Sequence, residues 1–211
     1  MNYPLVSIII PYRINRGYLS QAIESIHAQN YPGAIEIIQS NHDAGVSFNI
    51  NRGIEKASGE FIKYLCEDDW LPVNSIKDSV EGIQDHDFIH GKAYGYFNQR
   101  KVVPYEPPIK YPTLEQNATR NVIHGGSLMY RKSVFERLGL FDESLDCAEE
   151  LEMNLRCLQS GMSIGYVDKF LYYYRRHEEQ KSLGKGVDQS VRLIKINKIY
   201  NRFRTTKHIS L

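Results

Sequence analysis

The sequence lacks a long hydrophobic run and an excess of either charge. No segment is apolar for long enough to span a bilayer, and the apolar stretch 5–10 is too short for the core of a signal peptide. With 26 basic and 25 acidic residues, the net charge is only +1, whereas nucleic-acid binders usually carry a strong basic excess. Nucleic acid is therefore not an expected partner.

Cysteine is also scarce, at three residues in 211. Cys66, Cys147 and Cys157 form no Cys-x-x-Cys pair, and no histidines accompany them at zinc-site spacing. An odd number without a pattern is typical of reduced thiols, so we expect a cytoplasmic protein. The length suffices to bury a substantial hydrophobic core.

What the sequence does contain is an alternation of strand and helix signals over its first ninety residues. Residues 5–10 form a β-rich apolar run ended by Pro11, as expected for a strand buried on both faces. This alternation predicts an α/β fold with a Rossmann-like, mostly parallel central sheet flanked by helices. In such sheets ligands bind beyond the carboxyl ends of the strands. The expected strands are residues 5–10, 35–38, 61–65 and 87–90, and the expected helices lie near residues 19–26, 46–57 and 73–83.

The second half of the chain has a different pattern. Residues 94–105 look like a hairpin, which adds a small antiparallel region, and the prolines between 104 and 112 predict a stiff loop. The other expected elements are strands at residues 127–130, 164–167 and 170–174 and helices at residues 133–138, 147–160 and 187–203. We expect a single domain, 1–211, with two halves that divide near residue 92.

Three consecutive acids, Glu67, Asp68 and Asp69, directly follow the third expected strand. Like charges at this distance repel, and burial would drive protons onto them unless a positive charge compensates. A bound Mg²⁺ or Mn²⁺ would compensate, because hard cations take carboxylate oxygens and keep positions open for phosphate oxygens. A solvated acidic turn in which Asp69 or Asn74 caps the next helix explains the spacing equally well.

Four parts of the chain, in order, resemble the motifs of family 2 glycosyltransferases. They are residues 6–12 (Val-Ser-Ile-Ile-Ile-Pro-Tyr), 22–26 with 29–32, 51–72 around the three acids, and 131–143. The resemblance implies a GT-A fold, a nucleoside-diphosphate sugar donor with UDP favoured, a divalent cation (Mn²⁺ or Mg²⁺) and inversion at the anomeric carbon. Residues 1–92 would then form the nucleotide-binding half and residues 93–211 the acceptor half.

The same resemblance implies roles for individual residues. The family's Asp-x-Asp element falls on Glu67, Asp68 and Asp69, with Asp68 or Asp69 as the direct metal ligand. His177 ends a Tyr-rich segment similar to one in the family that reaches the metal or the diphosphate, with Arg176 as an alternative phosphate contact; a lone histidine after a strand is as often a surface residue. The residues expected at the nucleotide are Pro11, Tyr12, Arg13, Asn41, Asp43, Asn51, Glu67 and Asp68.

Two positions depart from the family's pattern. After the second strand the family usually presents paired acids, one of which binds the base of the nucleotide, whereas this chain has Asn41 and, two residues later, Asp43. The family also often has an arginine just before the position of Asn51, where this chain has Ile50. The candidates to replace that positive charge are Arg13, Arg52 and Lys63.

The candidate general base is Glu150. An inverting transfer needs a carboxylate to take the proton of the acceptor hydroxyl, and residues 148–156 resemble the family's Glu-Asp helix, whose second acid is the base. Helical spacing puts Glu149, Glu152 and Arg156 opposite the apolar stripe and Glu150 at its edge, where a cleft would lie. The alternative is that acids in this first turn only complement the helix dipole.

The acceptor is expected to be a glycan or a lipid-linked saccharide. The segment His124-Gly125-Gly126 would border its site or form a plain tight turn. A basic C-terminal helix would touch anionic lipid, placing the protein peripherally at the inner face of the membrane, or would simply be solvated. Its basic residues are Arg192, Lys195, Lys198, Arg202, Arg204 and Lys207.

Together these features predict an inverting, metal-assisted glycosyltransferase. One alternative is a non-catalytic nucleotide- or glycan-binding module of the same fold, which the departures at Asn41 and Ile50 leave open. The other is a sugar nucleotidyltransferase, which would need a glycine-rich loop after the first strand to bind a triphosphate. Residues 11–17 offer only one glycine for such a loop.

Overall fold

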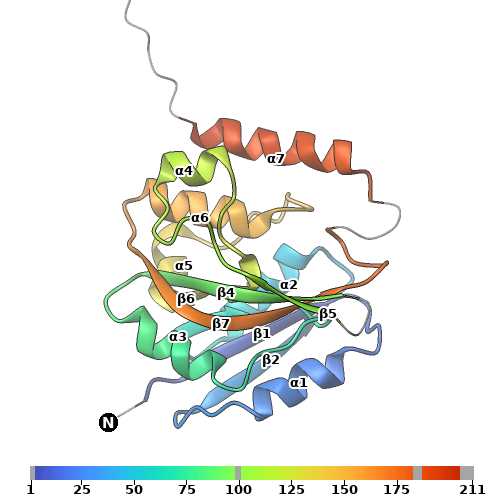
Figure 1. Cartoon of the computed structure of the whole chain (residues 1–211), viewed down its shortest axis with the longest axis vertical. Coiled ribbons are helices and arrows are strands. Elements are labelled where there is room, and N and C mark those ends of the chain that lie inside the picture. The colour runs from blue at the N-terminus through green and yellow to red at the C-terminus, as the bar shows by residue number, and fades with distance from the viewer. Residues whose placement is uncertain (1–2, 98–100, 183–186, 205–211) are drawn as a thin grey trace, which may run out of the picture.

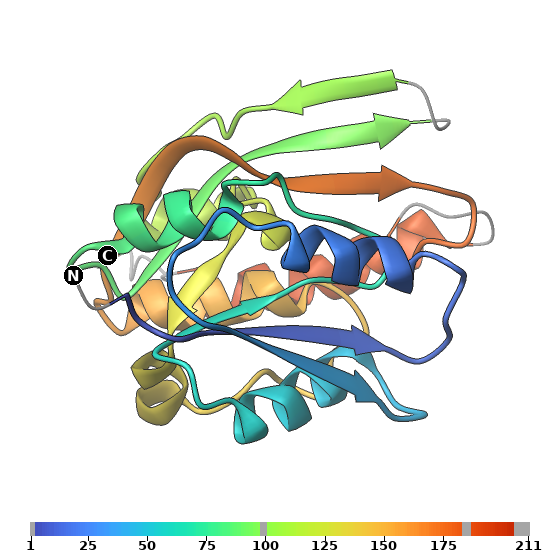
Figure 2. The same cartoon turned by 90° about the horizontal axis from the view of Figure 1, so that it is seen from below.

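Three parallel strands form the first part of the central sheet (Figure 2). Strands β1 (Val6–Tyr12), β2 (Ile35–Asn41) and β3 (Phe61–Tyr64) pair with β1 between the other two. Residues 6–10 have no exposed surface, because apolar layers cover both sides of β1 as the sequence predicts. The computed structural model describes residues 3–97, 101–182 and 187–204.

The remaining strands extend this sheet. β6 (Met129–Arg131) lies between β3 and β4 (Phe88–Phe97) and is antiparallel to both. β4 forms a hairpin with β5 (Lys101–Tyr105) and pairs in parallel with β7 (Ile164–Arg176). The described residues thus form a seven-stranded sheet of order β2-β1-β3-β6-β4-β5, with β7 also on β4. Because β1, β2, β3, β4 and β7 all run the same way, the predicted mostly parallel α/β sheet is confirmed.

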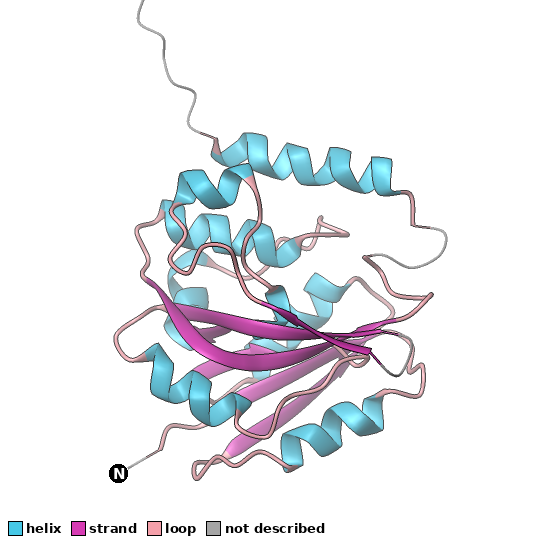
Figure 3. Cartoon of the chain, viewed as in Figure 1, coloured by secondary structure: helices cyan, strands magenta, loops and turns pink. Residues whose placement is uncertain are grey.

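Helices cover both faces of the sheet (Figure 3). On one face, α1 (Leu19–His27) and α3 (Ser75–Ile83) share an apolar core with β1. On the other face lie α2 (Val46–Lys56), α5 (Lys132–Leu138) and α6 (Glu149–Gln159), which share a second core. These helices lie where the sequence predicts them, since their apolar residues recur at the spacing of a helix that packs one face on a sheet.

A third layer packs on α6, away from the sheet (Figure 1). It consists of α4 (Leu114–Thr119) and the C-terminal helix α7 (Gln189–Phe203). Helix α4 is absent from the sequence prediction, although Thr113 and Gln116 form a capping box at its start and offered a recognisable signal. In the described part of the chain, no helix combines the length and apolarity needed to cross a membrane.

Three details of the second half differ from the prediction. β7 is one continuous strand where two were predicted, because the break in apolar pattern marks an irregularity in its pairing with β4 rather than an end. Residues 125–127 form a 3₁₀ turn, η1, so the predicted strand at 127–130 begins two residues later. The expected division near residue 92 falls inside β4, which runs through both halves.

Candidate functional site

A pocket of about 350 Å³ opens beyond the carboxyl end of β3. Its lining comes from the turn after β3, the segment 121–126, the first turn of α6 and the end of β7. Asp68 and Asp69 line this pocket together with Glu149 and Glu150. The fold therefore brings two of the three residues predicted at the metal, Asp68 and Asp69, into one cavity with the predicted base, although more than 80 residues separate the acids from the base in the sequence.

Asp69 is the most deeply held of the three acids. Its side chain is 2% exposed; one carboxylate oxygen accepts from the backbone N–H of Arg175 at 2.7 Å and the other from the hydroxyl of Tyr172. Burial, and then the charge of Asp68, raise the pKa of Asp69 well above its usual range. Both oxygens are thus engaged by the protein.

Asp68 faces the pocket more freely and meets His177. The imidazole Nε2 of His177 lies 2.9 Å from a carboxylate oxygen of Asp68, and the two side chains are 11% and 20% exposed. Both residues were predicted to lie near a metal or a diphosphate, and the structure brings them together although 109 positions separate them in the sequence. His177 follows the last residue of β7.

Glu67 turns away from water and is bound by Arg16. A guanidinium nitrogen of Arg16 lies 2.9 Å from Oε1 of Glu67, while Oε2 is buried without a hydrogen-bond partner among the described residues. Burial and the neighbouring Asp68 raise the pKa of Glu67, and Arg16 opposes that rise. Arg16 also lies 3.3 Å from Glu179. The sequence did not single out Arg16, which lies in the loop after β1. The one signal for it was that this loop follows the carboxyl end of a strand, where ligands were expected to bind.

Arg175 is the second residue that the sequence did not single out. Its guanidinium lies 4.4 Å from the ring centre of Tyr18 and 4.7 Å from that of Trp70, and its Nε donates to the carbonyl of Asp68 at 2.7 Å. It therefore fixes the backbone of the acidic turn. The guanidinium of the neighbouring Arg176, the alternative phosphate contact of the prediction, lies 5.3 Å from the ring centre of Phe97.

Glu150 lies in the first turn of α6, half-buried in the wall of the pocket. Burial, followed by the charge of Glu149, raises its pKa to about 7. The side chain packs directly on Gly125: a β-carbon there would be 2.8 Å from its Cγ. The segment at 124–126 thus borders this pocket and also forms the turn that the sequence offered as the alternative, while its contact with an acceptor stays a prediction.

The other acids of α6 do not follow the sequence prediction. Glu149 was expected to face solvent, yet it lines the pocket and lies 3.2 Å from Lys181. Glu152 was expected to be exposed, yet it is 1% exposed and bound by Arg156 and by Arg202 of α7. The reason is that α7 packs over α6, which the spacing within α6 cannot reveal.

Burial lowers the pKa of two basic groups near the pocket. His124 lines the pocket, and burial and the proximity of Lys63 lower its pKa to about 4. Lys63 is fully buried beneath the segment 124–128, where it donates to the carbonyls of Gly126 (2.8 Å) and Leu128 (3.1 Å). Burial lowers the pKa of Lys63 to about 7. Lys63 therefore supports the pocket from below and is not the missing diphosphate charge.

The predicted nucleoside contacts lie at the ends of β1 and β2. Tyr12 is paired in register with Asn41, and its hydroxyl donates to Gln39 at 3.2 Å. Arg13 and Asp43 are both well exposed and lie 3.8 Å apart. Pro11 precedes them within β1, so this part of the predicted set does share one edge of the sheet.

Asn51 has a different environment from the other predicted nucleotide contacts. It is 2% exposed, and its side-chain amide bonds the backbone of Phe141 in both directions (2.9 and 3.0 Å) and a carboxylate oxygen of Glu143 (2.8 Å). It ties α2 to the loop after α5 and has no free group to offer a nucleotide. Arg52 is likewise engaged, by Glu55 at 2.6 Å. We therefore correct the assignment of Asn51 to the nucleotide site.

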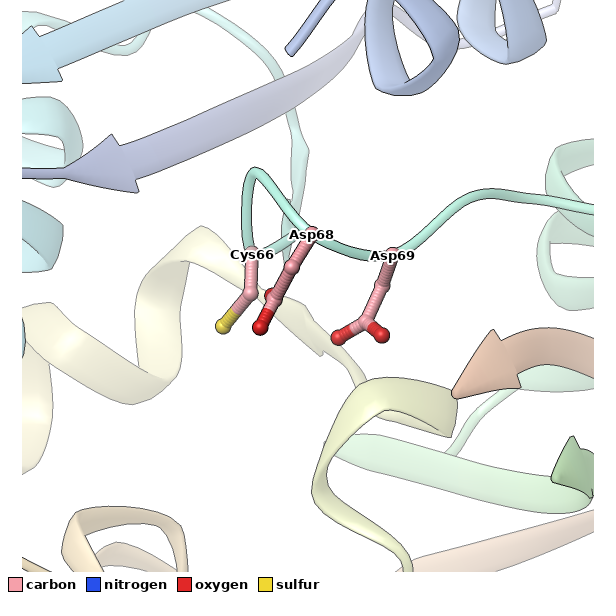
Figure 4. Close-up of side chains that lie close together, drawn as sticks. All are labelled: Cys66, Asp68 and Asp69. Atoms are coloured by element: carbon pink, nitrogen blue, oxygen red, sulfur yellow. The ribbon is translucent and has the colours of Figure 1, made fainter. Parts of the chain in front are cut away.

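The residues around Asp68 fit a divalent cation. Cys66, Asp68 and Asp69 each offer one ligand atom, and these atoms all lie within 4.8 Å of one another. Figure 4 shows the three side chains extending from one short turn in the same general direction. Carboxylate oxygens suit Mg²⁺ and Mn²⁺, so the donor set agrees with the predicted metal, while Cys66 is a member that the sequence analysis did not propose.

Comparison with known sequences gives consistent relatives. A family model described as "Glycosyl transferase family 2" matches residues 30–139. An uncharacterized glycosyltransferase of Rickettsia typhi is 27% identical, over 84% of this chain and 65% of the relative. The uncharacterized glycosyltransferase EpsJ of Bacillus subtilis is 26% identical, over 82% of this chain and 62% of the relative. The chain thus spans slightly less than two thirds of these two relatives.

Comparison with solved structures identifies the fold. S. aureus TarS residues 1–349 in complex with UDP-GlcNAc matches with a TM-score of 0.68 at 18% identity, over 96% of this chain and 72% of that chain. The complex of the same protein with UDP matches with a TM-score of 0.65, also at 18% identity, over 96% of this chain and 71% of that one. The predicted GT-A fold is therefore confirmed.

Proposed function

The chain belongs to glycosyl transferase family 2, and on that basis we propose that it transfers a sugar from a nucleoside-diphosphate sugar to a hydroxyl group of a glycan or lipid-linked saccharide. The observation that carries the proposal is the shared pocket, in which Asp68 and Asp69 lie together with Glu150. A transfer of this kind needs acids that can hold a metal at the diphosphate and a separate carboxylate that acts as base.

Glu150 is the proposed general base. As the acceptor oxygen attacks the anomeric carbon, its proton passes to the carboxylate of Glu150, and the bond from that carbon to the diphosphate breaks on the opposite face. The configuration at the anomeric carbon is thereby inverted. A base works best when its pKa is near the operating pH, and burial raises the pKa of Glu150 to about 7.

Asp68 is the proposed metal ligand, with Asp69 behind it and His177 beside it. When bound there, Mn²⁺ or Mg²⁺ would neutralise the charge on the departing diphosphate. Asp69 holds the turn in shape through Tyr172 and Arg175. Arg16, which is ion-paired with Glu67, would add a positive charge beside the acidic turn.

The donor is proposed to be a UDP-sugar. Support comes from the position of the expected nucleoside contacts at one edge of the sheet, where β1 and β2 end: Pro11, Tyr12, Arg13, Asn41 and Asp43. Arg16 donates to Oε1 of Glu67. Glu67 would therefore contribute to nucleotide binding by holding the guanidinium of Arg16 in place. The fold is also shared with a TarS structure that contains UDP-GlcNAc.

The acceptor and the location are proposed from α7. Its outer side carries the exposed apolar residues Val191, Leu193 and Ile194 and the exposed Lys198. This combination suits an anionic lipid surface. We therefore place the protein in the cytoplasm, bound peripherally at the inner face of the membrane, where a lipid-linked acceptor would lie. Lys195 is bound by Asp146, so the helix is less basic toward solvent than the sequence suggests. Lys207 lies outside the described residues.

The proposal is tested by a thermal-shift screen of UDP, GDP, CDP and TDP, each with Mn²⁺, Mg²⁺ or EDTA. A ligand at 100 times its Kd adds ~2.7 kcal/mol to the free energy of unfolding, so stabilisation by one nucleotide that requires the metal is expected. The response should be lost in Asp68→Asn and kept in the control Asp168→Asn, which removes an exposed acid paired with Lys92.

Activity is then measured with the matching nucleotide sugar. Release of the nucleoside diphosphate by wild-type protein and its loss in Glu150→Gln would support a transferase. Nucleotide binding without turnover, and with no effect of Glu150→Gln, would instead identify a non-catalytic binding module. Absence of any nucleotide response from the folded protein would refute the proposal.

A further inference from the structure

We propose that the thiolate of Cys66 is a ligand of the divalent cation, beside Asp68, so that the site takes Co²⁺ or another sulfur-binding transition metal in preference to Mg²⁺. The inference rests on the proposed function only in assuming that a cation binds at the acidic turn. It concerns a residue that falls outside the predicted Glu67-Asp68-Asp69 set, and it changes the chemistry of the site from all-oxygen to mixed sulfur and oxygen.

The turn after β3 places the thiol among the carboxylates. The backbone N–H of Asp69 donates to the carbonyl of Cys66 at 3.1 Å, which closes a tight turn and brings the side chains at its two ends toward each other. The Sγ atom of Cys66 and one oxygen each of Asp68 and Asp69 then lie within 4.8 Å of one another. Figure 4 shows the thiol and the carboxylate of Asp68 side by side.

The cation has reason to use the thiol, because Asp69 is already engaged. Both carboxylate oxygens of Asp69 accept hydrogen bonds from the protein, from Tyr172 and from the backbone of Arg175. Asp68 and Cys66 are both half-buried, and both line the pocket. Asp69 could bind a cation only by giving up one of its hydrogen bonds. Cys66 is a free cysteine, so its sulfur is available as a ligand in place of Asp69.

The turn also shows an electrostatic need for a positive charge. Oε2 of Glu67, a side chain only 3% exposed, is buried in this same turn without a hydrogen-bond partner among the described residues. Arg16 lies on the other oxygen of this carboxylate, so the charge of Glu67 is compensated on that side alone. Asp68 follows directly and lines the pocket, where a bound cation would offset the combined charge of the turn.

Ligand chemistry then decides which cation is preferred. Mg²⁺ prefers oxygen ligands, whereas thiolate sulfur favours softer ions, and affinities for mixed sites rise from Mn²⁺ to Co²⁺ and beyond. The thiol releases its proton to solvent as the sulfur–metal bond forms, and no electron is transferred. A site of this composition should therefore bind Co²⁺ more tightly than Mg²⁺.

The test uses the full chain, kept reduced with a phosphine, and Co²⁺ as the probe. A thiolate bound to Co²⁺ gives a near-ultraviolet charge-transfer absorption that oxygen ligands do not give. We expect this band in wild type and in the control Cys147→Ser, whose cysteine also lines the pocket but lies outside the cluster. The band should vanish in Cys66→Ser. Affinity for Co²⁺ should also fall at least ~10-fold, because the loss of a residue that only supports a metal ligand already weakens metal binding by about that factor.

The outcomes separate this inference from the proposed function. Co²⁺ binding without the band in wild type, a band that persists in Cys66→Ser, or no Co²⁺ binding at all would each overturn the role of Cys66. The function itself is judged by nucleotide release with Mn²⁺. If Cys66→Ser keeps that activity and wild type lacks the band, only the thiolate inference fails. If wild type shows the band but neither binds nor cleaves any nucleotide sugar, only the proposed function fails.

Discussion

A single methyl group at Gly125 should slow the proposed reaction by ~10²-fold without removing any side chain that makes a polar contact. A β-carbon at this position would lie 2.8 Å from Cγ of Glu150, 3.2 Å from its Cδ and 3.0 Å from the hydroxyl of Tyr64. Carbon atoms pack at about 3.5–4.0 Å, so the flexible side chain of Glu150 has to retreat by ~1 Å. A displacement of that size costs ~10²-fold in rate, which corresponds to ~2.7 kcal/mol in activation free energy.

The assay for Gly125→Ala is steady-state release of the nucleoside diphosphate, combined with the nucleotide thermal shift. We expect kcat to fall by about two orders of magnitude while nucleotide stabilisation stays unchanged, because the acidic turn is not touched. The control is Gly45→Ala, at φ −63° with no atom within 4 Å of the added carbon. Wild-type kcat in Gly125→Ala, or a loss of activity that merely follows a loss of nucleotide binding, would refute the reasoning.

Three further changes probe other parts of the site. Burial raises the pKa of Glu150 to about 7, and a general base acts only when it is deprotonated. The value of kcat/KM should therefore rise with pH through about 7 and then become constant. A flat pH profile across that range would contradict the assignment of Glu150 as base. Asn51→Ala should lower the free energy of unfolding in urea by ~1–3 kcal/mol by stranding its buried partners; weaker nucleotide binding would return Asn51 to the nucleotide site. The pKa of Lys63 is lowered to about 7, so above that pH the unfolded chain binds one more proton than the folded one. Wild-type stability relative to Lys63→Met should therefore rise between about pH 7 and about 10, by at most ~1.4 kcal/mol per pH unit, and an equal pH dependence in both proteins would disprove the buried, neutral lysine.

The parts of the fold that the sequence predicts well are those set by short-range patterns. Residues 5–10 are apolar without alternation, and the structure buries β1 on both faces. The acidic turn follows a strand whose carboxyl end meets those of β1 and β2, so the position of Asp68 follows from topology alone. Glu150 stands at the edge of an apolar stripe, and it lines the pocket there.

The parts that the sequence does not predict depend on contacts between distant segments. Glu152 looks solvent-exposed on a wheel of α6, yet α7 covers it. Lys63 is a charged residue that the sequence offers as a contact for the diphosphate, yet the segment 124–128 lies over it and accepts its hydrogen bonds. Asn51 follows Ile50, the position at which the family often has an arginine, and was therefore expected at the nucleotide. Its partners are instead Phe141 and Glu143, some ninety residues away. In each case the deciding neighbour belongs to another layer of the fold.

The geometry of the site is set by one short segment between the base and the acids. Gly125 packs on Glu150, while a β-carbon on Gly126 would lie 2.0 Å from the ring of Tyr172, whose hydroxyl holds Asp69. Lys63 fixes this segment from beneath through the carbonyl of Gly126. Two adjacent glycines are needed because a side chain on the first displaces the base and a side chain on the second displaces the support of the acids. The positions of Glu150 and Asp69 therefore depend on this segment as well as on α6 and β3, and changes at the two glycines should disturb different halves of the same reaction.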